Sequence, residues 1–268
     1  MSKPIKFSYS RINTFNNCPQ KYKIQYLDKI RTDCNSIEAY MGNRVHDVLE
    51  KLYKINSLNK EYISFDTLYN MYNESWKEEW NENIFISKYK FNKNNYNKLT
   101  VYKTGLLCLK NYYKRFNQKG YFKENIYATE LKIEVKIGGY HFIGYIDRLD
   151  IDSSGIIDII DYKTGSKSKG KLQASKDLQM AIYEIAIINL FKNYKQINLN
   201  LYYLKNDKII TFSHSSKQVE NLKKDIIARI KKIESTKHYF AKESILCEWC
   251  YYWNECDIKV GNNPSIRL

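Results

Sequence analysis

Apolar residues recur with the spacing of a helix in the first part of this chain and with the alternation of a strand further on. After Ser8-Tyr9-Ser10 the spacing is helical, and Ser10 is the expected N-cap of the first helix. Pro19 interrupts the helix just after Cys18, and a proline suits the first turn of a helix that restarts there. A second helix is expected from about residue 37 to 55. Its apolar stripe consists of Met41, Val45, Val48, Leu49 and Leu52.

Residues 56–125 are polar and aromatic, with repeated Asn and Lys, and show neither strand alternation nor a Gly/Pro linker. We therefore expect a helical insertion within one domain rather than a separate domain. Its Tyr and Trp side chains could stack on nucleic-acid bases. The favoured interpretation is that they form the insertion's own core.

Strand patterns begin at residue 126. Residues 126–137 alternate, and Gly138-Gly139 turns the chain into a second expected strand at 141–151. The polar segment 152–155 leads into a third strand at 156–162. In the first strand one face holds Leu131, Ile133, Val135 and Ile137, and the other holds Lys132, Glu134 and Lys136.

The remaining pattern predicts a helix at about 175–191, strands at 197–204 and 208–212, and a helix at 216–235. Helices, a three-strand meander, a helix, a strand pair and a helix form an α/β fold with a mixed central sheet flanked by helices. We expect one domain over residues 1–268.

Composition narrows the class of protein. With 268 residues, 43% of them hydrophobic, the chain can bury a core. No stretch approaches the roughly 18–20 apolar residues of a membrane span, and the start has no apolar signal segment. We expect a soluble, intracellular (cytoplasmic) protein without a membrane partner.

The net charge of the chain is strongly positive, with 44 Lys+Arg against 29 Asp+Glu, which gives +15. A positive charge of this size suits a nucleic-acid partner. A/T-rich codon usage, which raises the number of lysines everywhere, explains the charge equally well.

Two acids and a lysine form the first chemical constellation. Asp161 and Lys163 follow the apolar run 156–160 and, two residues apart on a strand, project from the same face. Asp147 is expected at the end of the neighbouring strand. Paired carboxylates bind Mg2+ or Mn2+, and the lysine could hold a water or stabilise charge on phosphorus. For an isolated Asp-x-Lys a capped turn and a solvated lysine are the favoured alternative, but Asp147 and Gly165 weaken it.

Six cysteines form the second constellation, and three of them make a C-x2-C-x5-C pattern. These are Cys247, Cys250 and Cys256. A tetrahedral metal or cluster site usually has four such ligands, and the fourth would come from Cys18, Cys34 or Cys108. Zinc is one alternative, although structural zinc more often uses two C-x2-C pairs. A group of reduced, unligated thiols is another.

Four motifs occur in an informative order. They are Gly42-x-x-x-His46, Gly144-Tyr145-Ile146-Asp147, Asp161-Tyr162-Lys163-Thr164-Gly165 and Gln179-x-x-x-Tyr183. In this order the chain resembles RecB-like nucleases of the PD-(D/E)XK superfamily, which share a restriction-endonuclease-like core. The resemblance runs from about Ser8 to Cys256. The position taken by Glu in many members is Asp161 here, as is common in the RecB-like branch.

The resemblance implies the role of each residue. His46, Asp147, Asp161 and the backbone carbonyl of Tyr162 would bind the catalytic Mg2+ or Mn2+. Lys163 would be the catalytic lysine, and Glu130 could assist. Gln179 and Tyr183 would lie beside the DNA strand. Metal-activated water would then hydrolyse a phosphodiester and leave a 5′-phosphate, with exonuclease action on single strands or ends more expected than endonuclease action.

The cysteines resemble those of AddB-like nucleases and CRISPR-associated iron–sulfur exonucleases, in which one cysteine precedes the nuclease motifs and three follow. The resemblance implies a 4Fe-4S cluster that joins residues 241–260 to the start of the chain and acts as a structural staple. Its ligands would be Cys18, Cys247, Cys250 and Cys256. Cys34 and Cys108 match nothing and are expected to be ordinary buried thiols.

Two alternatives to a DNA nuclease stay open. The chain could be an accessory DNA-binding or partner-binding component of a CRISPR-adaptation or helicase–nuclease assembly. It could also be a zinc-stapled DNA-binding protein. The sequence contains no G-x-x-x-x-G-K-[ST] motif, so any helicase would be a separate chain.

Overall fold

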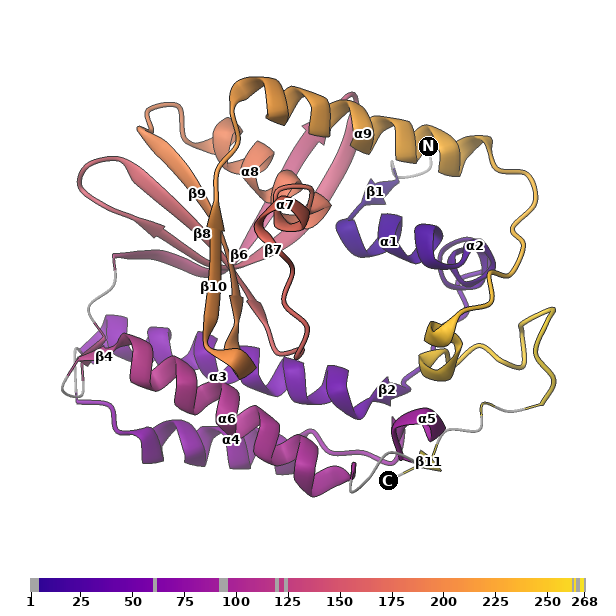
Figure 1. The fold of residues 1–268 in the computed structure, drawn as a ribbon, viewed down its shortest axis with the longest axis horizontal. Helices are drawn as coiled ribbons and strands as arrows, with labels where there is room; N and C mark the ends of the chain where they lie inside the picture. Colours follow the sequence, from indigo (N-terminus) through magenta and orange to yellow (C-terminus); the bar gives the residue numbers. More distant parts are fainter. Residues whose placement is uncertain are drawn as a thin grey trace.

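The computed structural model describes residues 5–59, 62–91, 96–118, 121–122, 125–261, 263 and 266–267. A mixed sheet lies at its centre, between two groups of helices (Figure 1). Its strands are β1 (Lys6–Phe7), β6 (Ile126–Ile137), β7 (Tyr140–Ile151), β8 (Ile156–Lys163), β9 (Gln196–Tyr203) and β10 (Lys208–Phe212). The fold class expected from the sequence, an α/β core with a mixed central sheet flanked by helices, is confirmed.

Strand pairing follows the chain. β6, β7 and β8 form an antiparallel meander, β9 lies parallel to β8, and β10 returns antiparallel to β9. The short β1 pairs in parallel with the start of β7. The turn between β6 and β7 uses Gly138 and Gly139, whose φ angles of 57° and 88° are left-handed and favour glycine.

One group of helices packs on the first face of the sheet. It consists of α1 (Tyr9–Asn17), α8 (Leu178–Leu190) and α9 (Ser216–Ser235). The other face is covered by α3 (Ile37–Asn59), α4 (Phe65–Glu78) and α6 (Lys98–Phe116). β8 therefore carries apolar residues on both sides: Ile157 and Ile159 join the first core, and Ile160 and Tyr162 join the second. This double burial explains why four of its first five residues are isoleucine, with Asp158 between them.

Shorter elements complete the described chain. They are α2 (Pro19–Tyr22), a π-helical turn (Lys23–Leu27), α5 (Lys88–Phe91), α7 (Lys171–Ala174), 3-10 turns η2 (Leu204–Asn206) and η3 (Ile245–Trp249), β2 (Asn35–Ser36), β3 (Ile84–Ile86), β4 (Asn117–Gln118), β5 (Tyr121–Phe122) and β11 (Ile266–Arg267). Among the described residues, no helix combines the length and apolar character that crossing a membrane requires.

The structure corrects three local predictions. Ser8, not Ser10, caps α1, and its hydroxyl accepts the N–H of Arg11. The helix expected from residue 175 begins at Leu178, because the Asp177 side chain caps it. The 56–125 segment is not free of strands: β3, β4 and β5 lie within it, each too short to produce an alternating pattern. The boundaries of the insertion and the single-domain organisation stay predictions.

Candidate metal centre and cysteine cavity

The candidate metal centre lies where β7 and β8 separate. Their paired register includes Arg148 opposite Ile160. Beyond this pair, the backbone N–H of Tyr162 on β8 donates to the side chain of Asp147 on β7, whose Oδ2 accepts it at 2.6 Å. Asp147 was expected at a strand end, but β7 continues beyond it to Ile151. Asp147 is thus held inside the sheet rather than on a loop, which fixes its carboxylate.

Asp161 and Lys163 project from the same face of β8, as predicted. Lys163 Nζ lies 2.5 Å from Asp161 Oδ2 and donates to Gln179 Oε1 at 3.0 Å. The Asp161 side chain is only 2% exposed, and its Oδ2 has no partner with hydrogen-bond geometry. A buried carboxylate oxygen is costly unless a cation neutralises it, and here the Lys163 ammonium supplies that charge. The same oxygen has the chemistry of a metal ligand.

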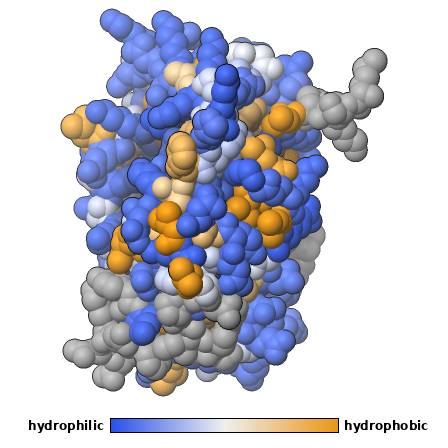
Figure 2. Space-filling view, turned by 90° about the vertical axis from the view of Figure 1, so that its right-hand side faces the viewer, coloured by the Kyte–Doolittle hydropathy of each residue, from blue (hydrophilic) through white to orange (hydrophobic). Residues whose placement is uncertain are grey.

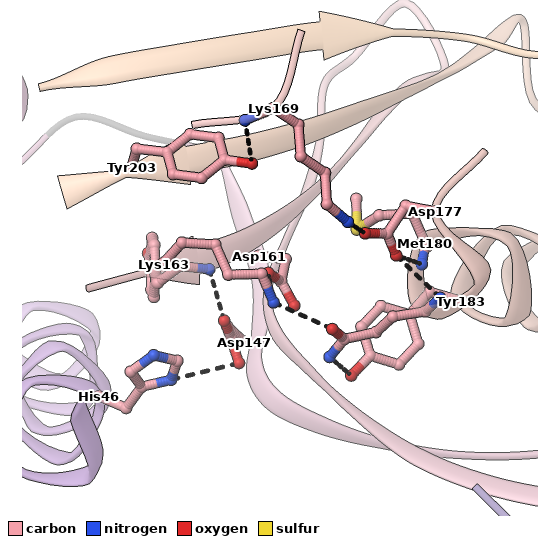
Figure 3. Close-up of polar contacts among 11 residues, drawn as sticks. His46, Asp147, Asp161, Lys163, Lys169, Asp177, Met180, Tyr183 and Tyr203 are labelled. Atoms are coloured by element: carbon pink, nitrogen blue, oxygen red, sulfur yellow. Dashed lines mark hydrogen bonds and ion pairs between the residues drawn. The ribbon is translucent and has the colours of Figure 1, made fainter. Parts of the chain in front are cut away.

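His46 and Glu130 approach Asp147 from other elements. His46, on α3, places Nδ1 3.4 Å from Asp147 Oδ1 (Figure 3). Glu130 lies in β6 with a left-handed φ of 47°, which departs from the strand conformation of its neighbours. One ligand atom from each of these three residues lies within 4.8 Å of the others. Asp161 is outside this group, so of the predicted side-chain ligands the group contains only His46 and Asp147. Its third member is Glu130, which was expected only to assist.

Burial and the charges of neighbouring groups shift the pKa values of the candidate ligands. Burial and the charge of Asp147 raise the pKa of Glu130 to about 7. Burial also raises the pKa of Asp161 to about 6, with Asp147 adding to the rise and Lys163 opposing it. Burial disfavours the charged His46, but the charge and hydrogen bond of Asp147 outweigh it and raise its pKa to about 9. A site in which carboxylates resist ionisation, and in which a histidine is drawn into the charged form, lacks positive charge.

The donor set fits a hard divalent cation. Carboxylate oxygens and one imidazole are ligands that Mg2+ and Mn2+ accept, and the protein offers them from α3, β6, β7 and β8. The Tyr162 carbonyl, which the resemblance adds, belongs to the residue whose N–H holds Asp147. In Figure 3 the His46 ring and the Lys163 ammonium lie on different sides of Asp147.

The predicted DNA-contacting pair shares one face of α8. Gln179 Nε2 donates to Tyr183 Oη at 2.8 Å, and Gln179 Oε1 accepts from Lys163. Sequence reasoning missed how this helix is anchored: Asp177 accepts the N–H groups of Gln179 and Met180 and pairs with Lys169 Nζ at 2.5 Å. The available signal in the sequence was Asp177 directly before an apolar helical run, because an acid at this position is a typical helix N-cap.

The four predicted cluster cysteines line one cavity of about 250 Å3. Cys18 comes from the junction of α1 and α2, and Cys247, Cys250 and Cys256 come from η3 and the loop after it. Cys18 Sγ accepts the backbone N–H groups of Lys21 and Lys242, each at 3.5 Å. All six cysteines lie within the described residues, and no disulfide joins any two of them.

This cavity opens on a side of the molecule where the surface is mixed. Figure 2 shows hydrophobic groups set among a largely hydrophilic surface on the side that carries the last part of the chain. Exposed apolar residues near the cysteines are Phe240, Ile245, Leu246, Ile258 and Val260. The other two cysteines do not line the cavity. Cys108 is buried in α6 as expected, whereas Cys34 is only half-buried, so the prediction of a buried thiol is wrong for Cys34.

Comparison with known proteins places this geometry in context. The family model of the PD-(D/E)XK nuclease superfamily matches residues 6–257. A curated relative from Clostridium botulinum strain Hall, named as a subunit of an ATP-dependent helicase/deoxyribonuclease, is 27% identical over 259 residues, which cover 85% of this chain and 22% of that protein. The protein of the same name from Alkaliphilus metalliredigens is 24% identical over 253 residues, with the same coverage. The chain thus spans about a fifth of the length of these curated relatives.

A solved structure supports the same fold. The crystal structure of a candidate exonuclease from Eubacterium rectale superposes with a TM-score of 0.50, at 9% identity, over 97% of this chain and 90% of that one. At this level of identity the similarity concerns the fold.

Proposed function

The chain belongs to the PD-(D/E)XK nuclease superfamily, and from that premise we propose that it is a metal-dependent DNA nuclease stapled by a 4Fe-4S cluster. The observation that carries the proposal is the convergence of His46, Asp147 and Lys163 from three separate elements beside the buried Asp161. Exonuclease action on single strands or ends is the mode we favour. The relatives named as components of a helicase/deoxyribonuclease support DNA as the substrate.

His46, Glu130, Asp147 and Asp161 would hold Mg2+ or Mn2+, with the Tyr162 carbonyl as a further ligand. When bound, the ion supplies positive charge that stabilises the reacting phosphate and lowers the pKa of a nearby water. The fit rests on ligand atoms of His46, Glu130 and Asp147 that lie within 4.8 Å of one another, and on carboxylates whose pKa values are raised by burial and by each other.

Lys163 contributes a positive charge of its own. Burial disfavours its ammonium, but Asp161 outweighs this effect and raises the pKa of Lys163, so the side chain stays charged at neutral pH. Its ammonium is shared between Asp161 and Gln179, which aims it toward the acids. From there it can stabilise negative charge that develops on a phosphate oxygen or orient a water.

Gln179 and Tyr183 would contact the DNA strand. Both face the metal centre from α8, and a cavity of about 360 Å3 between α8, β7 and the start of α1 includes them in its wall. A substrate phosphate at the acids would lie beside this wall. The net charge of +15 supports a polyanionic substrate.

The cysteine cavity would hold the 4Fe-4S cluster. Four thiols from both ends of the chain line it, which is the number that such a cluster needs. The cluster would close a loop that contains strands β6 to β10 and so hold the start of α2 against residues 247–256.

We also propose that the protein works with a helicase. The relatives are named as subunits of an ATP-dependent helicase/deoxyribonuclease, while this chain contains no Walker A motif. ATP-dependent unwinding would therefore come from outside these 268 residues. Co-purification of an ATPase with the tagged protein tests this part of the proposal.

The central test combines spectroscopy with digestion. The protein is purified without oxygen, its visible spectrum and iron content are recorded, and end-labelled single- and double-stranded DNA is digested with Mn2+ or Mg2+. We expect iron–sulfur absorbance and metal-dependent release of nucleotides from ends. Asp161→Asn and Lys163→Ala should abolish digestion. Asp158→Asn, on the same strand but hydrogen-bonded to Asn200, is the matched control and should retain it. Equal digestion by the Asp161 variant would refute the assignment, and zinc in place of iron would refute the cluster.

A further inference from the structure

Tyr162 touches two candidate metal ligands at once. Its backbone N–H donates to Asp147 Oδ2 at 2.6 Å. Its ring lies edge-on to the His46 ring, with centroids 5.8 Å apart and planes at 80°. The side chain is buried, so neither contact competes with water. The position of Tyr162 therefore sets how far His46 stands from Asp147.

The hydroxyl of Tyr162 is held by the helical insertion. Its Oη lies 3.1 Å from Oη of Tyr112 on α6, and the two rings meet edge-to-face at 5.5 Å. Tyr112 is fully buried. A residue inside the catalytic motif is thus tied to a helix of the 56–125 segment, for which the sequence offered no chemical role.

A buried arginine anchors Tyr112. Arg148 is 1% exposed, and its Nη1 donates to Oη of Tyr53 and of Tyr112, each at 2.7 Å. Its Nε and Nη2 donate to the two oxygens of Asp150 at 2.8 and 2.5 Å. The planar guanidinium makes such fixed, directional contacts where a lysine could not. Replacing a buried ion pair by apolar residues of similar volume often costs no stability. We therefore interpret this network as a means of fixing the relative positions of its side chains rather than only of stabilising the fold.

Two members of the network, Arg148 and Tyr53, lie on the same elements as candidate metal ligands. Arg148 directly follows Asp147 on β7. Tyr53 follows His46 by seven residues on α3, which is two helical turns, so both side chains lie on the same side of that helix. The circuit thus fixes α3, α6, β7 and β8 relative to one another, and three of these four elements carry candidate ligands.

We infer that the chain of contacts from Arg148 through Tyr112 to Tyr162 is a positioning device by which the insertion sets the affinity of the metal centre. This inference rests on the proposed metal-dependent function. Arg148 and Tyr112 are positioning residues, since they act through Tyr162 and the strands rather than on a substrate. Removing a hydrogen-bond partner that orients a metal ligand typically weakens metal binding by about 10- to 100-fold.

The test measures Mn2+ binding directly, by calorimetry and by the electron paramagnetic resonance of bound Mn2+, on the full chain without DNA. Tyr112→Phe removes one hydroxyl and keeps the ring. We expect its Mn2+ dissociation constant to rise about tenfold, with a broader resonance from a less uniform site. Arg148→Lys keeps the charge and loses the fork, and should raise the constant further. Tyr113→Phe is the matched control: its hydroxyl, on the same helix, donates to the Ile63 carbonyl at 3.0 Å, so we expect less than a twofold change.

The outcomes separate the two proposals. If the wild type binds Mn2+, Asp161→Asn abolishes that binding and Tyr112→Phe binds as the wild type does, the positioning role is overturned and the nuclease proposal stands. Equal weakening by Tyr112→Phe and Tyr113→Phe overturns it as well, because the effect would then be general destabilisation. If the wild type binds no Mn2+, both proposals fail. Should Arg148→Lys not fold, Tyr112→Phe decides alone.

Discussion

The metal centre and the cysteine cavity are built in different ways. The metal-centre side chains project from the long elements α3, β6, β7 and β8, and hydrogen bonds inside the protein already hold Asp147 and Lys163. The cysteines lie on a helix junction, a 3-10 turn and the loop after it. Packing alone can therefore preorganise the first site, whereas in the second site the proposed cluster would have to hold the parts together.

The largest effect should come from removing the divalent ion while leaving the cluster in place. Brief treatment with EDTA should lower DNA hydrolysis at least about a thousandfold, because the ion contributes several kcal/mol to transition-state stabilisation. Mn2+ should restore activity. The visible absorbance should not change, since the proposed cluster would be held by four thiolates and not by the ligands of the metal centre. Activity that survives EDTA would contradict the proposed chemistry, and absorbance lost together with activity would contradict the independence of the two sites.

The second prediction removes the proposed cluster and leaves the metal centre in place, by the substitution Cys250→Ser. We expect iron to be lost and the free energy of unfolding to fall by about 5 kcal/mol, the chain-entropy value of a cross-link that closes so long a loop. Mn2+ binding should persist within about threefold, because the core that holds Asp147 is untouched. Cys34→Ser, outside the cavity, is the control. Chemical denaturation, iron analysis and Mn2+ titration provide the measurements. Mn2+ binding lost along with iron would show that the two regions are coupled.

Metal affinity should depend on pH in a direction set by the acids and His46. A ligand must lose its proton to bind a cation, and the pKa values are about 9 for His46, about 7 for Glu130 and about 6 for Asp161. The Mn2+ dissociation constant should therefore fall as pH rises from 6 to 9, by up to about tenfold per pH unit for each proton released. His46→Asn should make the dependence shallower by about one proton. A flat profile in the wild type would show that the ion binds elsewhere.

A smaller pH effect, on the free energy of unfolding, should arise from His214, which contacts Glu184 of α8. The fully buried His214 places Nδ1 2.6 Å from Glu184 Oε2 and Nε2 2.9 Å from the Ser175 carbonyl. Burial disfavours its charged form, but the hydrogen bond to Glu184 outweighs this and raises the pKa of His214 above its usual value. A raised folded-state pKa adds stability that is complete below the unfolded-state value of about 6.5 and is lost as pH rises through the folded-state value.

The free energy of unfolding should therefore decrease by about 1–3 kcal/mol between pH 6 and the pH at which His214 loses its proton. His214→Gln should make this decrease smaller by the contribution of one proton, since His46, Glu130 and Asp161 also have raised pKa values, whereas the exposed His238→Gln should leave the decrease unchanged. Denaturant titrations at several pH values, without added metal, measure the difference. The same decrease in the His214 variant would assign the effect to other groups.

The sequence predicted the core because its strands have strong patterns. The isoleucine-rich start of β8, interrupted only by Asp158, reflects burial on both faces, and the alternation in β6 reflects burial on one. The motif order predicted which residues would meet, and the structure brings His46 to Asp147 and Asp161 to Lys163. Each of these signals is local or follows a known order.

What the sequence did not predict depends on long-range contacts or on single backbone angles. Nothing near Tyr112 or Arg148 indicates that they meet, because an ordinary tyrosine and arginine carry no local pattern. The left-handed φ of Glu130 reorients one residue within a regular strand pattern. The three residues of β3 are too few to alternate. Such features arise only when distant elements pack.

The order of the ligands along the chain has a consequence for synthesis. Every residue of the candidate metal centre precedes Gly165, whereas three of the four cavity cysteines follow Leu246. A chain leaving the ribosome would present its complete set of metal ligands, and β6 to β8, long before the last thiols emerge. We therefore expect cluster insertion to be a late maturation step on a largely folded core. Iron starvation should then yield molecules in which the metal centre is formed but the segment that contains Cys247, Cys250 and Cys256 is not held against Cys18.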